Sequence, residues 1–237
     1  MEQIDSAAIP QQTNSIASDE GLRSFMRNIF NLMTGALAVS GVTAWITYLL
    51  LGATLKAGWL PIIFALTPLA FVLVLSFGIH RLSYSTANLL FWLFSASMGL
   101  SLASIFVMFT TTSIASVFFI SAATFAAASL IGYTTKRDLT NMGTFLMVGL
   151  IGIVIAGVVN IFLASSALAF AISVIGVVVF VGLTAYDTQN LKNDYLTNGE
   201  VYGFDSPQKS ALFGALSLYL NFINIFQMLL NLLGVRE

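Results

Sequence analysis

The stretch IGVVVFVGLTAYDTQNLK, residues 175–192, runs from an uncharged apolar segment directly into a carboxylate, Asp187. The apolar segment extends back to residue 166, and about 20 apolar residues in a helix are enough to cross the hydrocarbon core of a bilayer. Ionisable side chains inside or at the edge of such a span are rare and mark functional positions. The stretch therefore predicts a membrane-spanning helix that carries a functional aspartate near one end.

The composition of the whole chain is that of a membrane protein with little or no soluble part. Of its 237 residues, 58% are hydrophobic and 8% are charged, whereas soluble domains carry about 25% charged residues. The net charge of -1 gives no reason to expect nucleic-acid binding. The chain has no cysteine and a single histidine, His80. Disulfides and thiolate metal sites are therefore excluded, and a histidine metal site or a Ser–His–Asp triad is not expected.

The hydrophobic segments predict an all-α membrane protein with seven transmembrane helices. Each segment is long enough to span a bilayer, and they lie near residues 28–51, 58–79, 86–109, 112–133, 142–163, 166–187 and 208–233. Residues 1–22 are polar and are expected to form a flexible cytoplasmic tail. The transmembrane domain is then expected to cover residues 23–237.

The distribution of Lys and Arg predicts the orientation of these spans. If every span crosses, most basic residues fall on one side: Arg23, Arg27, Arg81, Lys136, Arg137, Lys192 and Lys209. The other side carries only Lys56 and Arg236. Because positive loops stay in the cytoplasm, the N-terminus is expected to be cytoplasmic and the C-terminus outside. A re-entrant last segment would return the C-terminus to the cytoplasm, and the charge bias leaves that alternative open.

The last span carries a polar stripe. Ser210, Gly214, Ser217, Asn221 and Asn224 follow one another at spacings of four, three, four and three, which places them on one face of a helix. Polar groups facing hydrocarbon are costly, so this face is expected to point into the bundle and to make the last helix central. Two interpretations stay open: interhelical hydrogen bonds, or a water-lined path with Ser217 and Asn224 as pore-lining residues.

Small residues on the third span predict a second packing face. Ser95, Gly99 and Ala103 recur at every fourth position, and small residues let membrane helices approach closely. We expect this face to contact a neighbouring helix.

Three polar residues are expected at one membrane level. Asp187 and Arg81 lie at the cytoplasmic ends of their spans, and Asn221 lies about one third of the way into the last span from the same side. An arginine close to Asp187 would hold the carboxylate ionised and tie the spans together. A proton or a cation at the carboxylate would loosen this tie, which describes a gate with an ion-sensing latch. The alternative is an interfacial aspartate without such a role.

Three motifs carry a resemblance to a known family. GYTTKRDL (132–139), TAYDTQNLK (184–192) and GALSLYLNFINIFQMLLNLLG (214–234) resemble the transmembrane Bax inhibitor motif family, also called the Bax inhibitor-1 family. The likeness is strongest to its bacterial inner-membrane members and runs from about residue 23 onward. It implies seven helices with the last one central and surrounded by the other six, and a pH-sensitive calcium leak.

The resemblance also implies roles for individual residues. The family's sensor pairs an aspartate on the sixth helix with one on the seventh, and an arginine latches the closed state. The first aspartate falls on Asp187 and the arginine on Arg81, but the second aspartate is replaced by Asn221. Two neighbouring carboxylates share a proton, which an Asp–Asn pair has no need to do. We therefore predict a weaker or more acid-shifted pH response than in a two-aspartate relative.

The expected ligand is calcium or another cation, bound weakly and transiently at Asp187. Calcium prefers six to eight oxygen ligands, and conduction requires weak binding. An intramembrane aspartyl protease would need a second aspartate where the chain has Asn221, so no enzyme activity and no cofactor are expected. The alternative function is a non-conducting regulator in the bacterial inner membrane, which would act by binding other membrane proteins such as a membrane protease.

Overall fold

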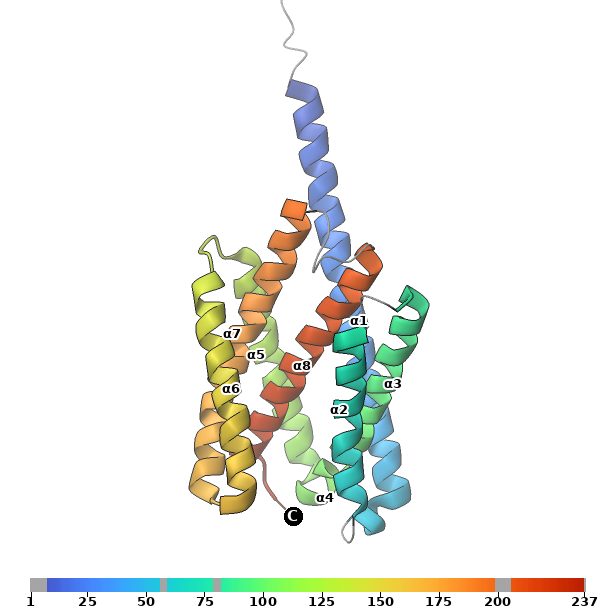
Figure 1. Ribbon diagram of the computed structural model, residues 1–237, viewed down its shortest axis with the longest axis vertical. Coiled ribbons are helices and arrows are strands. Elements are labelled where there is room, and N and C mark those ends of the chain that lie inside the picture. Colours follow the sequence, from blue (N-terminus) through green and yellow to red (C-terminus); the bar gives the residue numbers. More distant parts are fainter. Residues whose placement is uncertain (1–7, 56–58, 79–81, 199–205, 237) are drawn as a thin grey trace, which may run out of the picture.

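The described residues of the computed structural model form a bundle of helices (Figure 1). The structure describes residues 8–55, 59–78, 82–198 and 206–236. Its elements are α1 (Ala8–Leu55), α2 (Leu60–Gly78), α3 (Tyr84–Leu102), the single turn α4 (Ile105–Met108), α5 (Thr111–Thr134), α6 (Thr140–Leu163), α7 (Ser166–Asn198) and α8 (Pro207–Leu233). The predicted all-α membrane class is confirmed.

Most of the predicted spans correspond to helices of the required length. Six helical segments in the described part are long and apolar enough to cross a membrane. Within α2, the qualifying apolar stretch is the shorter Pro61–Leu75, so the crossing predicted near residues 58–79 stays a prediction. Large apolar side chains such as Phe145, Ile161 and Phe162 of α6 are more than 70% exposed, as expected of surfaces that face lipid.

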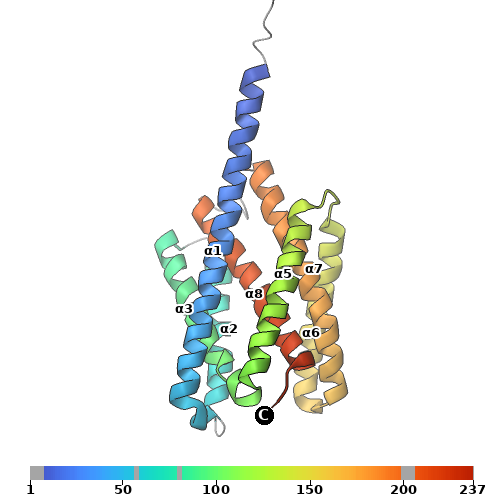
Figure 2. The ribbon, with the colours of Figure 1, turned by 180° about the vertical axis from the view of Figure 1, so that it is seen from behind.

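The last helix is the most buried of these segments, but it is not ringed by all the others. In its most apolar window, 67% of α8 residues are buried, against 11% in α6. α8 packs against α1, α3, α5 and α7, while α2 packs mainly on α3 and α6 on α7 (Figures 1 and 2). The predicted ring of six helices around the last span is therefore not what the contacts show.

The polar N-terminal segment continues into the first helix. Residues 8–22, expected to belong to a flexible tail, form the first turns of α1. Leu22 is only 5% exposed and belongs to the core, so the packed domain begins before residue 23. The N-terminal end of α1 and the C-terminus lie at opposite ends of the bundle (Figure 1), and α8 is continuous between them.

The predicted packing face on the third span is confirmed. A Cβ added to Gly99 would lie 2.5 Å from the carbonyl oxygen of Ser40 on α1, so the two backbones touch at this point. The Ser40 hydroxyl lies 2.7 Å from the Ser95 carbonyl oxygen and 2.7 Å from the Tyr219 hydroxyl. These buried contacts fasten α1, α3 and α8 together.

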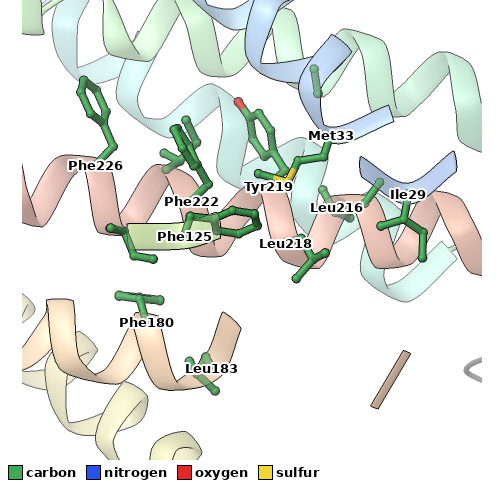
Figure 3. Close-up of a cluster of buried hydrophobic side chains, with 14 of the residues drawn as sticks. Ile29, Met33, Phe125, Phe180, Leu183, Leu216, Leu218, Tyr219, Phe222 and Phe226 are labelled. Atoms are coloured by element: carbon green, nitrogen blue, oxygen red, sulfur yellow. The ribbon is translucent and has the colours of Figure 1, made fainter. Parts of the chain in front are cut away.

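Apolar side chains fill the space around α8 (Figure 3). Phe222 meets Phe125 of α5 edge to face, with ring centroids 5.7 Å apart. Phe180 and Leu183 of α7 are also buried in this cluster. The polar stripe of α8 is consequently set within an apolar core.

Candidate functional site

Asp187 on α7 is held by two side chains of α8. The Ser217 hydroxyl and the Asn221 amide nitrogen both donate to the same carboxylate oxygen, Oδ2, at 2.7 and 2.8 Å. Ser217 and Asn221 are four residues apart, so they lie on one face of α8. The structure therefore brings Asp187, Ser217 and Asn221 together.

The other side of α7 is clamped to the connection between α5 and α6. The Gln189 side-chain oxygen accepts from the Leu139 main-chain N–H, and its amide nitrogen donates to the Arg137 carbonyl, both at 2.8 Å. Lys192 donates to the Tyr133 carbonyl at 2.7 Å. Residues two apart point to nearly opposite sides of a helix, so Gln189 faces this connection while Asp187 faces α8.

This clamp also fixes the depth of Asp187 in the bundle. Two residues of helix span about 3 Å along the axis, so Asp187 lies just below the level at which Gln189 reaches the connection. Lys136, Arg137 and Asp138 in that connection are exposed. The carboxylate is thus near one end of the bundle, beneath a polar edge.

Two glycines set the position of the α7 backbone. A Cβ on Gly132 of α5 would collide with the carbonyl oxygen of Ala185, and a Cβ on Gly143 of α6 would collide with the Tyr186 ring. Both neighbours directly precede Asp187. Sequence reasoning assigned no role to Gln189, Gly132 or Gly143, although the first two lie inside the quoted motifs. The signal that could have revealed the clamp was Gln189 itself, a polar residue two positions after Asp187.

These contacts join the three motifs, and comparison with known proteins agrees with them. Residues 22–237 match the family model described as inhibitor of apoptosis-promoting Bax1. The chain belongs to this family. It is 42% identical to the inner membrane protein YbhL of Escherichia coli, over 96% of this chain and 98% of the relative. It is 43% identical to the protein RP147 of Rickettsia prowazekii, over 92% of each.

In this Bax inhibitor family member, the polar stripe of α8 serves different contacts along its length. Gly214 packs against Leu191, because an added Cβ would lie 2.6 Å from that side chain. Asn224 donates to the Leu220 carbonyl of its own helix at 2.8 Å. The pore-lining role of Ser217 and Asn224 stays a prediction.

A polar cavity lies toward the opposite end of the bundle. It has a volume of about 670 Å³ and is lined by side chains of α6, α7 and α8, among them Asn160, Ser173 and Asn231. Met228, which also lines this cavity, packs on Gly176, where an added Cβ would lie 3.0 Å from the Met228 sulfur. α7 and α8 are therefore in close contact beside this cavity.

The oxygen atoms near Asp187 are few. Within the described residues, no group of three or more His, Cys, Asp or Glu side chains is placed to hold a metal ion. A cation at Asp187 would meet the carboxylate and the Ser217 hydroxyl, while Asn221 presents its amide nitrogen; these are fewer oxygen ligands than calcium prefers. The predicted latch residue, Arg81, lies outside the described residues.

Proposed function

We propose that this protein is a cation leak channel, with calcium as its cation, gated where Asp187 meets α8. The observation that carries this proposal is a carboxylate on a membrane-spanning helix whose Oδ2 accepts hydrogen bonds from Ser217 and Asn221. An intramembrane carboxylate costs stability unless it is paired. In this proposal, the channel opens when the pairing of Asp187 with α8 is broken and closes when the pairing is restored, which explains why a costly carboxylate is kept in the membrane.

The gate works by competition for one carboxylate. In the closed state, the two α8 donors hold α7 through Asp187 Oδ2. A cation or a proton at the carboxylate weakens these hydrogen bonds and releases α7 from α8. Because the site offers so few oxygen ligands, the cation binds transiently and moves on. Arg81 adds a positive charge to the closed state in this proposal.

We place the gate at the cytoplasmic end of a bacterial inner-membrane protein whose N-terminus is cytoplasmic and whose C-terminus is outside. The basic residues Lys136 and Arg137 at this end support the assignment. The name of the relative YbhL supports the choice of membrane. In this arrangement α8 lines the path, and Asn221 in place of a second aspartate gives a weak or acid-shifted pH response.

The test is calcium uptake into proteoliposomes of the purified protein at about pH 6, 7 and 8. Asp187→Asn removes the charge of the gate, and Asp194→Asn is the matched control, the same change on the same helix about two turns away. We expect flux above that of protein-free vesicles, altered by Asp187→Asn and unchanged by Asp194→Asn.

Two other outcomes would contradict the proposal in different ways. Flux that is the same in the wild type and both variants would contradict the gate. Absence of flux at every pH, including in Asn221→Asp, would contradict the channel. That second outcome would favour the alternative function, a regulator that binds other membrane proteins.

A further inference from the structure

Side chains of α1, α5 and α8 line an apolar groove, and Figure 2 shows α1 and α5 on either side of α8. One part has a volume of about 630 Å³ and continues into a second part of about 370 Å³. Leu37, Phe118 and Phe222 line both parts. α1 and α5 both pack on α8, and the groove between them is lined mainly by aromatic and aliphatic side chains.

The first part of the groove contains a buried hydroxyl without a partner. Ser129 is 6% exposed, and among the described residues its Oγ has no hydrogen-bond partner. Other hydroxyls of α5, including Ser121 and Thr124, donate to the carbonyl oxygen four residues earlier at 2.8 Å. A buried hydroxyl without a partner lowers the free energy of unfolding by about 1–3 kcal/mol. A ligand that accepts a hydrogen bond from Ser129 would restore this stability.

A positive charge stands at one end of the same groove. Arg23 of α1 and Tyr133 of α5 line this end, while Leu37 and Phe118 line the other. Arg23 is exposed and makes no ion pair with any residue in the described part of the chain. Lys192 donates to the Tyr133 carbonyl at 2.7 Å, so a second positive charge lies close to this end.

The length of the groove matches one leaflet of a bilayer. From Arg23 to Leu37, α1 rises by about 21 Å, at about 1.5 Å per residue. Half of the hydrocarbon core is about 15 Å thick, and the headgroup region adds several more. Ser129 lies one helical turn, about 6 Å, from Tyr133 toward the membrane centre. Ser129 therefore lies deeper in the groove than the end lined by Arg23 and Tyr133, on the side where the ester groups of a lipid lie below its phosphate.

We propose that this groove is a binding site for one anionic phospholipid. The phosphate pairs with Arg23, an ester carbonyl oxygen accepts from the Ser129 hydroxyl, and an acyl chain lies along the groove toward Leu37 and Phe118. Basic residues at a membrane surface attract anionic headgroups, which selects such a lipid over a zwitterionic one. The site is separate from the contact at Asp187 and does not depend on the proposed channel.

The test uses the purified full-length protein and counts retained lipid by native mass spectrometry. Phosphatidylglycerol and phosphatidylcholine with the same acyl chains are the two probes. Arg23→Gln removes the charge, with Arg27→Gln one turn away as its control. Because a charged hydrogen bond contributes about 1.5–3 kcal/mol, we expect Arg23→Gln to weaken phosphatidylglycerol binding about tenfold or more, and Arg27→Gln to leave it unchanged.

A second pair of variants blocks the groove itself. Ala126 of α5 lines it, whereas Ala123 is also exposed on α5 but lies outside the lining. We expect Ala126→Trp to abolish retention of the lipid and Ala123→Trp to leave it intact. Equal retention of both lipids by the wild type, or equal effects within each pair, would mean ordinary annular lipid and would overturn the proposal. A dimer that covers the groove would also overturn it.

Ser129→Ala tests the proposed hydrogen bond between the lipid and the Ser129 hydroxyl, through the unfolding temperature measured with and without lipid. In detergent without phospholipid, loss of a hydroxyl that lacks a partner is expected to raise the unfolding temperature. Phosphatidylglycerol is then expected to stabilise the wild type more than this variant, with binding to the variant weakened about threefold. The same lipid-induced shift in both proteins would refute the hydrogen bond to Ser129.

Discussion

Replacing Asn221 by aspartate is the sharpest test of the contact at Asp187. The Asn221 amide nitrogen lies 2.8 Å from Asp187 Oδ2, so Asn221→Asp would place two carboxylates in contact. At that distance two unit charges repel by about 6 kcal/mol at an effective dielectric of about 20. Protonating one ordinary aspartate at pH 7 costs only about 4 kcal/mol. The pair is therefore expected to hold one shared proton near neutral pH.

The consequence is a new pH dependence of calcium flux. Between about pH 6 and 8 the Asn221→Asp pair exchanges its shared proton, and we expect proteoliposome flux to vary several-fold over this range. The wild type, with one carboxylate at the contact, should vary less. The double variant Asp187→Asn/Asn221→Asp restores a single carboxylate and should return to the flatter profile. Identical pH profiles of the wild type and Asn221→Asp would refute the reasoning, and so would an equally steep profile in the double variant.

Three further predictions concern the clamp around α7 and the edge above it. Gln189→Leu removes hydrogen bonds to two main-chain groups of the α5–α6 connection, and we expect thermal unfolding in detergent to show a loss of about 1–3 kcal/mol. Gly132→Ala forces apart α5 and α7 and should destabilise strongly, whereas Gly152→Ala, with nothing within 4 Å, should not; equal effects would contradict the close packing. Hydrogen bonds from the Thr140 side chain and main chain hold the pKa of Asp138 below its ordinary value. Its contribution to stability is therefore present above about pH 4 and lost as the pH falls through the lowered pKa, so Asp138→Asn should leave the pH dependence of flux between about pH 6 and 8 unchanged.

The sequence predicted the class of fold from the length of its apolar segments, and the face of α8 that meets Asp187 from helical spacing. Apolar length predicts spans, and the spacing of Ser217 and Asn221 predicts a shared face. The spacing did not reveal which helices α8 contacts, because burial around a helix depends on packing between distant segments. The helical start of the chain was missed for a related reason: residues 8–22 are polar, and composition alone predicts solvation rather than helix.

The clamp escaped prediction because its partners are main-chain atoms. Gln189 bonds a main-chain N–H and a main-chain carbonyl of the α5–α6 connection, groups that every residue carries. Gly132 acts through the absence of a side chain, where Ala185 approaches it. Neither partner leaves a side-chain pattern, although both positions lie within motifs that the sequence singled out.

The energy of the contact fits a gate that is closed most of the time. With Asp187 ionised, as the proposed gate requires, the two hydrogen bonds would contribute about 1.5–3 kcal/mol each, or about 3–6 kcal/mol for Ser217 and Asn221 together. In the proposed gate, such a difference would keep an open state well below a few per cent of the population, as a slow leak requires. Gln189 holds α7 on its other side, and Tyr219 ties α8 to Ser40 on α1. In the proposed gate, loss of the bonds at Asp187 would therefore separate α7 and α8 locally, while these other contacts keep the rest of the bundle packed.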